Sequence, residues 1–170
     1  MNCTEADLVH QLGRVEDNHL YVMLATAASQ YGVSIAFLLA VASRETNMRH
    51  IIGDEGHGVG ILQLDTQHPF AARLVANGTW NTPDGTQQLI NACTALLASD
   101  QAWAEKAYPQ YGGDNKDGTR KLAADAYNAG VGGAGYGASR GDADMRSTGH
   151  DYGSDVIERM HVLEGLLGGK

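Results

Sequence analysis

Cysteine is scarce in this chain of 170 residues, which contains Cys3 and Cys93 alone. Two cysteines cannot supply the several disulfides that stabilise many small secreted domains. Cys93 lies in a helical pattern of apolar residues, so we expect a small buried thiol there, whereas Cys3 lies near a chain end. A bridge between the two is the less favoured alternative.

Long apolar runs and an N-terminal leader are also missing. No run of about 18 apolar residues occurs, so the sequence predicts no helix that spans a bilayer and no membrane insertion. The first residues, MNCTEADLVHQL, include acidic residues and lack a basic region followed by an apolar core, so we predict no secretory signal peptide. We expect a chain that stays in the cytoplasm until it is released or exported by another route.

Positive charge is in deficit. The 12 lysines and arginines are outnumbered by 20 aspartates and glutamates, which gives a net charge of −8. Nonspecific binding to nucleic acid or to an anionic membrane normally needs a basic face, so this balance argues against both partners. We expect any anionic polymer substrate to be held by local contacts and not by overall attraction.

Proline is rare, with 3 residues, whereas glycine is common, with 22. This balance fits helices joined by tight loops, and a hydrophobic fraction of 43% fits a folded chain with one core. The glycine-rich segments 53–60 and 130–137 are predicted to be loops, and a short strand or hairpin is predicted over 59–64. The spacing of apolar residues predicts helices over 4–15, 19–31, 34–45, 69–75, 86–100 and 122–129 and near the C-terminus.

These elements together predict the fold class. Most segments are predicted to be helical, so we expect a mainly α (α+β) fold in which helices surround a central buried helix. A small β-hairpin or short sheet is expected beside the first glycine-rich loop. Capping residues are predicted at Thr4 for the first helix, at Asp17 or Asn18 for the second and at Ser34 for the third. No repeat or linker is apparent, so a single domain over residues 1–170 is predicted.

Glu45 lies at an informative place on the predicted central helix. It follows Ala42 by three residues and Leu38 by seven, so it continues the apolar face of that helix at its C-terminal end. Burial and the negative end of the helix dipole both disfavour an ionised carboxylate, and a carboxyl that keeps its proton near neutral pH can act as a general acid. A frayed last turn with Glu45 in water is the alternative, and the spacing alone leaves both open.

Two aspartates follow Glu45 closely. Asp54 lies in the glycine-rich loop, and Asp65 ends the short extended run. Alone, each is more often a turn former than a catalyst. Together with Glu45 they can form one cleft, and cleavage of a glycosidic bond with inversion needs an acid and a base roughly 6.5–9.5 Å apart.

Other chemistries are less well supported. Gly130, Gly132 and Gly135 match the dinucleotide-binding pattern G-x-G-x-x-G, but a helix is predicted before them and no clear helix directly after them. No P-loop and no serine or cysteine nucleophile motif is present, and a zinc site would need His57, Asp65 and the distant His150 to converge. We therefore predict no metal and no cofactor.

Several short motifs occur in a characteristic order. They are SRET at 43–46, GD at 53–54, GVGILQLD at 58–65, GTWN at 78–81, GT at 85–86, AYNAG at 126–130 and HDY at 150–152. In this order they resemble the catalytic region of goose-type lysozymes and of the lytic transglycosylase domains that share their fold. The resemblance runs from about Tyr21 to the end of the chain.

The resemblance implies a lysozyme-like fold with a cleft for the glycan strands of peptidoglycan. Glu45 matches the general acid of the family, and Asp54 and Asp65 match two aspartates that position or activate water. The residues that match the lining of the site are Gln63, Tyr127, Asn128 and Tyr152. We expect a monomer.

The implied activity is that of a muramidase, which hydrolyses the β-1,4 bond between N-acetylmuramic acid and N-acetylglucosamine with inversion. The transglycosylase branch generally lacks the two aspartates, so its 1,6-anhydro product is the alternative, and a glycan-binding module without catalysis is less favoured. The cysteines of secreted vertebrate members are not matched by Cys3 and Cys93. With no signal peptide, this suits a bacteriolytic phage endolysin or a bacterial wall enzyme.

Overall fold

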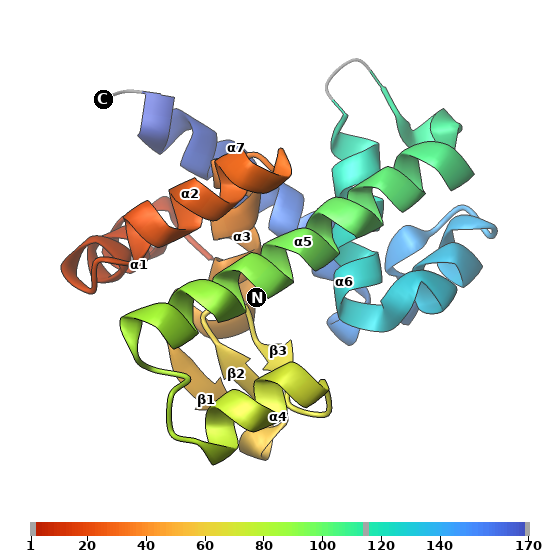
Figure 1. Cartoon of the computed structure of the whole chain (residues 1–170). Coiled ribbons are helices and arrows are strands. Elements are labelled where there is room, and N and C mark those ends of the chain that lie inside the picture. The colour runs from red at the N-terminus through yellow and green to blue at the C-terminus, as the bar shows by residue number, and fades with distance from the viewer. Residues whose placement is uncertain (1–2, 114–115, 169–170) are drawn as a thin grey trace. The chain divides into compact units, whose positions relative to one another are not determined.

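The computed structural model describes residues 3–113 and 116–168, with the exception of the Asp54 side chain (Figure 1). The chain divides into two compact units, one formed by Cys3–Ala95 and one that begins at Leu96. The boundary falls inside the long helix α5, so this helix contributes residues to both units. That the chain acts as a single domain stays a prediction.

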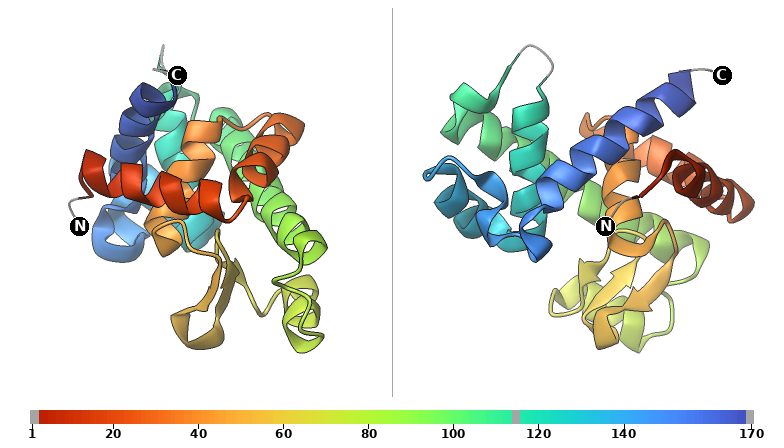
Figure 2. Two further views of the ribbon diagram at one scale, coloured as in Figure 1. Left: turned by 90° about the vertical axis from the view of Figure 1, so that its left-hand side faces the viewer. Right: turned by 180° about the vertical axis from the view of Figure 1, so that it is seen from behind.

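The first unit combines helices with a small sheet. Its elements, in chain order, are α1 (Glu5–Asp17), α2 (Leu20–Tyr31), α3 (Ile35–Thr46), β1 (Ile51–Gly53), the 3-10 turn η1 (Asp54–Gly56), β2 (Gly58–Gly60), β3 (Leu64–Asp65), α4 (Pro69–Ala76) and the beginning of α5 (Pro83–Ala107). Figure 2 shows α1 and α2 beside α3, with the sheet following the C-terminal end of α3.

The predicted N-terminal cap is confirmed for α1 but not for α2. Thr4 caps α1 in a capping box, in which its side chain accepts the Asp7 N–H and the Asp7 carboxylate accepts the Thr4 N–H. The predicted cap of α2 at Asp17 or Asn18 is wrong. Helix α1 extends through Asp17, and His19 takes the N-cap position in a left-handed conformation without a side-chain bond.

Helix α3 is the core of this unit. Every residue from Ala36 to Ser43 is buried, so the helix has no solvent-facing stripe over these two turns. The one polar side chain in this run, Ser43, donates a hydrogen bond of 2.6 Å to Gln11 Oε1 on α1. Because that pair is buried and bonded, it links α1 to α3 without an unsatisfied polar group. The predicted central buried helix is confirmed.

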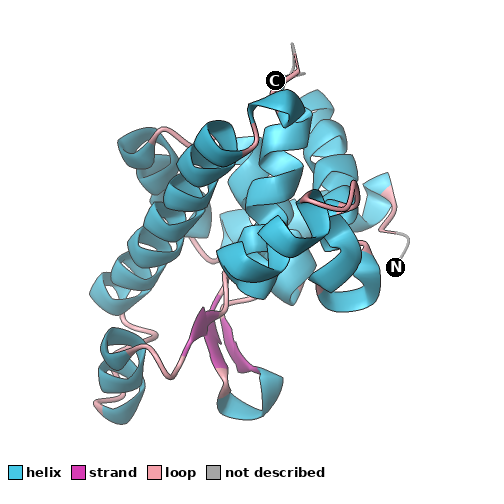
Figure 3. Cartoon of the chain, turned by 90° about the vertical axis from the view of Figure 1, so that its right-hand side faces the viewer, coloured by secondary structure: helices cyan, strands magenta, loops and turns pink. Residues whose placement is uncertain are grey.

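The strands form one antiparallel meander in the order β1-β2-β3 (Figure 3). In its register Gly53 pairs with Gly58, and Gly58 pairs in turn with Asp65. Residues directly opposite one another in antiparallel strands share a face of the sheet. The pairing therefore makes a row of two glycines and one aspartate across this end of the sheet.

The second unit is helical in all its described elements. It contains the end of α5, the 3-10 turn η2 (Pro109–Tyr111), α6 (Asp117–Ala138), the 3-10 turns η3 (Ala143–Arg146) and η4 (Thr148–His150), and α7 (Tyr152–Gly168). Its core joins Leu122, Ala126 and Ala134 of α6 to Ala104 of α5 and Ala143 of η3.

The predicted loop over 130–137 is wrong, because α6 continues through it after a kink. Gly130 alone departs from helical geometry, with φ 73° and ψ 157°. The Tyr108 hydroxyl donates to the Gly135 carbonyl at 3.0 Å, and a side chain on Gly137 would collide with the Asp142 carbonyl oxygen. Glycine here allows close packing of neighbouring segments against the helix, which outweighs its low helix propensity.

The predicted fold class is confirmed for the described part of the chain. It is mainly α, with seven α-helices and one small three-stranded antiparallel sheet. Cys93 is 1% exposed, as its place in an apolar pattern predicts. None of the helices in the described ranges is both long and apolar enough to span a membrane.

Candidate active site

Glu45 lies in the last turn of α3 and is neither fully buried nor fully exposed. The chain leaves the helix directly after it, because Asn47 and Met48 both adopt left-handed conformations with φ 52° and 57°. The Met48 N–H closes the helix end by donating to the Ala42 carbonyl at 3.1 Å. The predicted position at a helix terminus is confirmed, and the residue as a whole is half-buried there.

Thr46 connects this helix end to the turn between β2 and β3. Its hydroxyl oxygen lies 2.9 Å from the Ile61 carbonyl and 3.1 Å from the Ala42 carbonyl, and it accepts the Arg49 N–H at 3.0 Å. Thr46 is 4% exposed and Ile61 is 1% exposed, so the connection is buried. Thr46 thus links the last turn of α3, which carries Glu45, to the β2–β3 turn that precedes Asp65.

Gln63 lies across the glycine row of the sheet. It adopts a left-handed conformation with φ 54°, and its amide nitrogen donates to the carbonyls of Gly60 at 2.7 Å and Ile51 at 3.3 Å. A side chain on Gly53 or Gly58 would collide with the Gln63 amide oxygen. The two glycines therefore make room for Gln63, and both amide hydrogens bond within the sheet. Contact between Gln63 and a substrate stays a prediction. The Gln63 amide oxygen is the group that could make this contact, because the amide nitrogen is already bonded.

Asp65 ends β3 and is exposed. One of its carboxylate oxygens accepts the Gln67 N–H at 2.7 Å, which is the side-chain turn bond that aspartate commonly forms. Its register opposite Gly58 places it in the same row as Gly53. An exposed, ionisable carboxylate in this position has the chemistry needed to hold a water molecule.

Asp54 begins η1 directly after Gly53, so the backbones of Asp54 and Asp65 both lie at the end of the sheet that the glycine row occupies. The side chain of Asp54 lies outside the described part of the structure. Its predicted role stays a prediction that rests on backbone position.

The remaining predicted site residues belong to the second unit. Tyr127 and Asn128 lie on α6 just before the kink at Gly130, and both are half-buried. The Asn128 side-chain oxygen accepts the Thr148 N–H at 2.8 Å. Tyr152 begins α7, is 2% exposed, and donates its backbone N–H to the Ser147 hydroxyl at 3.3 Å. The structure thus brings Asn128 and Tyr152 to the two ends of η4.

One polar cluster beside these residues was not found from the sequence. Asp125 is fully buried on α6, and the clue was a charged residue in the apolar helix LAADAYNA. Burial and the nearby Asp144 carboxylate raise the pKa of Asp125 to about 7. Burial alone would also raise the pKa of Asp144, but hydrogen bonds from Lys121 and Ser154 lower it.

His50, directly before β1, is held by contacts to Trp80 and Thr86. Its Nε2 lies 3.2 Å from the Trp80 carbonyl and 3.3 Å from the Thr86 hydroxyl, and its ring stacks on Trp80 at 5.1 Å. Burial lowers the pKa of His50. Within the described ranges, no three His, Cys, Asp or Glu side chains are grouped so that they could hold a metal ion.

The glycine pattern at Gly130, Gly132 and Gly135 has a different context from the one predicted. A helical segment does follow Gly130 directly, contrary to expectation. A helix also precedes it, however, whereas the dinucleotide motif needs a strand there. The rejection of nucleotide binding therefore depends on the preceding element alone.

A mainly α chain with a small antiparallel sheet, and with a half-buried glutamate at the helix end that meets this sheet, is consistent with a lysozyme-like fold. No protein-family model matches the chain. It is 28% identical to lysozyme g of Takifugu rubripes over 170 residues, which cover 94% of this chain and 83% of that protein. It is 29% identical to lysozyme g of Struthio camelus over 131 residues, which cover 75% of this chain and 57% of that protein. Both matches are to proteins named lysozyme g, so the chain is similar to goose-type lysozymes over most of its length.

Proposed function

We propose that this chain is a peptidoglycan hydrolase, and more narrowly a muramidase that cleaves the β-1,4 bond between N-acetylmuramic acid and N-acetylglucosamine. Two relatives that carry the name lysozyme g support the broader proposal. The observation that carries the narrower one is the position of Glu45, half-buried in the last turn of α3 and tied through Thr46 to the sheet that bears Asp65.

In the proposed reaction Glu45 is the general acid. Partial burial and the negative end of the α3 dipole both favour its protonated form. The carboxyl donates its proton to the glycosidic oxygen as the bond to the anomeric carbon breaks, so the leaving sugar departs as a neutral alcohol. The resulting carboxylate is reprotonated from solvent after the reaction, and Asp65 releases to solvent the proton that it takes from the attacking water.

Asp65 is the proposed base, assisted by Asp54. Its exposed carboxylate accepts a proton from a water molecule, which attacks the anomeric carbon from the face opposite the leaving group. Inversion of configuration follows from that direction of attack. The support is the register that brings both aspartate backbones to one end of the sheet.

The residues proposed to line the glycan site are Gln63, Tyr127, Asn128 and Tyr152, of which Tyr152 is 2% exposed and lies beneath the surface. Gln63 offers its amide oxygen, because its nitrogen bonds to the sheet. Asn128 offers its amide nitrogen, because its oxygen accepts the Thr148 N–H. We further propose that the enzyme acts as a monomer on glycan strands of the bacterial wall.

Product analysis on purified peptidoglycan tests this function. The full chain is incubated with the polymer, and the soluble fragments are examined by mass spectrometry before and after borohydride reduction. Reducing N-acetylmuramic acid ends support the muramidase. Ends with 1,6-anhydromuramic acid would replace it with the transglycosylase, and binding of the polymer without soluble fragments would indicate a glycan-binding module.

A further inference from the structure

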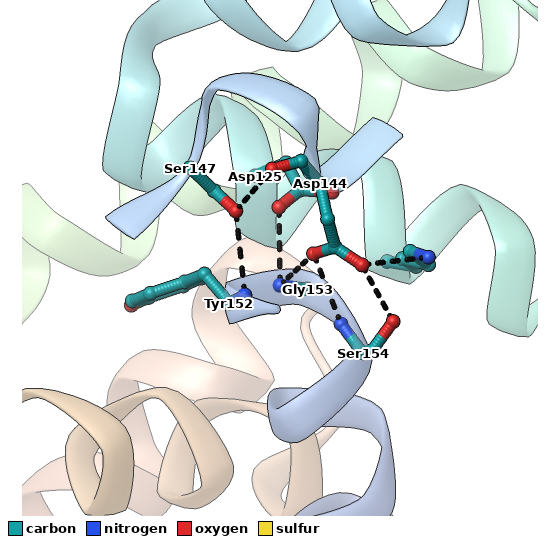
Figure 4. A network of polar contacts seen from close by, with 7 residues as sticks. Asp125, Asp144, Ser147, Tyr152, Gly153 and Ser154 are labelled. Carbon is teal, nitrogen blue, oxygen red and sulfur yellow. Dashed lines mark hydrogen bonds and ion pairs between the residues drawn. The ribbon is translucent and has the colours of Figure 1, made fainter. Parts of the chain in front are cut away.

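Two aspartates from separate segments hold the start of α7. The Gly153 N–H is shared between Asp125 Oδ1 on α6 at 3.0 Å and Asp144 Oδ1 on η3 at 2.8 Å (Figure 4). Asp144 also accepts the Ser154 N–H at 3.3 Å, and its Oδ2 pairs with Lys121 Nζ at 2.8 Å. This cluster, which we call the α7 anchor, joins α6, η3 and α7.

The α7 anchor is closely packed around Gly153. A side chain added at this position would lie 2.6 Å from both Asp125 Oδ2 and the Lys121 carbonyl oxygen. Only a residue without a side chain can approach Asp125 this closely. The position of the α7 backbone at its first turn therefore depends directly on the Asp125 carboxyl.

The anchor lies directly beside two residues proposed to line the glycan site. Tyr152 is the neighbour of Gly153, and its own N–H bonds to the Ser147 hydroxyl, which donates to the Asp144 carbonyl at 2.9 Å. Asn128 lies three residues after Asp125 on α6 and holds the Thr148 N–H. Any shift of η3 or of the first turn of α7 therefore moves the surroundings of both side chains.

We propose that Asp125 is a positioning residue for glycan binding, which holds Tyr152 and Asn128 in their binding arrangement as an uncharged carboxyl group. The proposal rests on the proposed function of the chain. Asp125 itself is fully buried, so it acts through Gly153 and does not touch the sugar.

The surroundings of Asp125 explain why it is uncharged in this arrangement. Its Oδ2 is buried and has no hydrogen-bond partner among the residues that the structure describes. The charged groups of the anchor are the Asp144 carboxylate and Lys121, and the ammonium group of Lys121 pairs with Asp144. Burial, followed by Asp144, raises the pKa of Asp125 to about 7, so its proton is lost as the pH rises through that value.

Loss of that proton puts two carboxylates on one backbone N–H. Their repulsion loosens the start of α7, so glycan binding weakens above neutral pH. Because Asn128 and Tyr152 are proposed to line the glycan site, we expect KM to rise about fivefold between pH 6 and pH 8.

The decisive variant is Asp125→Asn, which keeps the shape and the acceptor oxygen but has no proton to lose. We expect it to retain the wild-type KM at pH 6 and to abolish the rise at pH 8. Asp100→Asn is the matched control, because burial raises the pKa of Asp100 to about 6 and it has no part in the α7 anchor. This control should keep the rise. Retention of the rise in Asp125→Asn, or a wild-type KM that does not change with pH, would overturn the proposal.

A second measurement separates this inference from the proposed function. Carboxyl and side-chain NMR signals of Asp125, Tyr152 and Asn128 are followed from pH 5 to pH 9 without substrate. We expect the Tyr152 and Asn128 signals to move with the midpoint of Asp125, and to stay still in Asp125→Asn. If the wild type cleaves no peptidoglycan, the proposed function fails and this titration still decides the positioning role. Tyr152 and Asn128 signals that do not shift at the titration midpoint of Asp125 would refute the positioning role.

Discussion

At the scale of single residues, the position of Glu45 matters most. The carboxyl lies where a fully buried helix core meets the turn that Asn47 and Met48 make. An acid that is half-shielded can keep its proton and still reach a substrate from solvent. Full burial would favour the protonated carboxyl but would keep the substrate away from it. Full exposure would admit the substrate but would favour the ionised carboxylate.

The substitution Glu45→Gln removes the transferable proton and keeps the shape of the side chain. We expect lysis of cell walls to fall about 100- to 10,000-fold, because a general acid typically contributes 10²–10⁴-fold, while the unfolding midpoint stays within a few degrees. Turbidity of a wall suspension and circular dichroism measure the two effects. Glu55→Gln, at an exposed glutamate between β1 and β2, is the control and should lyse walls normally. Lysis by Glu45→Gln at the control rate would remove Glu45 from the mechanism.

Asp65→Asn tests the base separately from the acid. Because an amide cannot take a proton from water, we expect turnover to fall about 100-fold with little change in glycan binding. Turnover is measured from released reducing ends, and binding from a pull-down on the same walls. The amide oxygen can still accept the Gln67 N–H, so the local turn is retained. Unchanged turnover would show that Asp65 holds no essential water.

At the scale of elements, the second half of α6 shows how packing changes the meaning of a sequence. The segment after Gly130 has four glycines, at 132, 133, 135 and 137, and is nevertheless helical. The hydroxyls of Tyr108 and Tyr111 donate to the carbonyls of Gly135 and Ala138 near the end of the helix. The helix is thus stabilised by tertiary contacts from η2 and α5, and its own residues contribute little to its stability.

Two alanine substitutions in this helix should have opposite effects. Gly137→Ala places a methyl group against the carbonyl oxygens of Asp142 and Ala143, so we expect it to lower the free energy of unfolding by about 1–3 kcal/mol. Gly132→Ala meets nothing within 4 Å and should raise the free energy by about 0.5–1 kcal/mol through helix propensity. Urea denaturation of both variants gives the comparison. Equal effects would mean that the close approach at Gly137 does not matter for stability.

At the scale of the whole molecule, charge governs how the chain meets its proposed substrate. The net charge of −8 repels an anionic cell wall at long range, whereas binding depends on short-range contacts. Salt weakens the long-range repulsion first, because the Debye length falls from about 30 Å at 0.01 M to about 8 Å at 0.15 M.

We therefore expect wall lysis to speed up severalfold when sodium chloride is raised from about 0.01 M to about 0.15 M. Initial rates of turbidity loss measure this effect. The control is an uncharged soluble chitooligosaccharide, whose binding or cleavage should depend little on salt. A lysis rate that falls with added salt would indicate a local basic surface that dominates the encounter.

The sequence was sufficient to predict features that depend on neighbours along the chain. Apolar spacing placed α3 and put Glu45 at its end, and the acidic start of α1 revealed the cap at Thr4. The fold class followed from the same periodicity. These features were accessible because helix formation is read from residues three and four positions apart.

Features that depend on distant residues were not predictable in the same way. The Asp125 carboxyl shares the Gly153 N–H with Asp144, and these two residues lie 28 and 19 residues further along the chain. The hydrogen bonds from the Gln63 amide nitrogen to the carbonyls of Ile51 and Gly60 were likewise not apparent from the sequence. In both cases the decisive partner is set by the fold and leaves no periodic signal in the sequence.

The arrangement of Gln63 over the glycine row has a consequence for heat tolerance. Strands of two or three residues are too short to be stable alone. The hydrogen bonds from the Gln63 amide nitrogen to Ile51 in β1 and to Gly60 in β2 therefore stabilise the sheet. Warming should break these hydrogen bonds before the helices melt, and the backbones of Asp54 and Asp65 would then no longer be held at the same end of the sheet. We therefore expect the proposed hydrolysis to stop at a temperature where the helical circular dichroism signal is still intact.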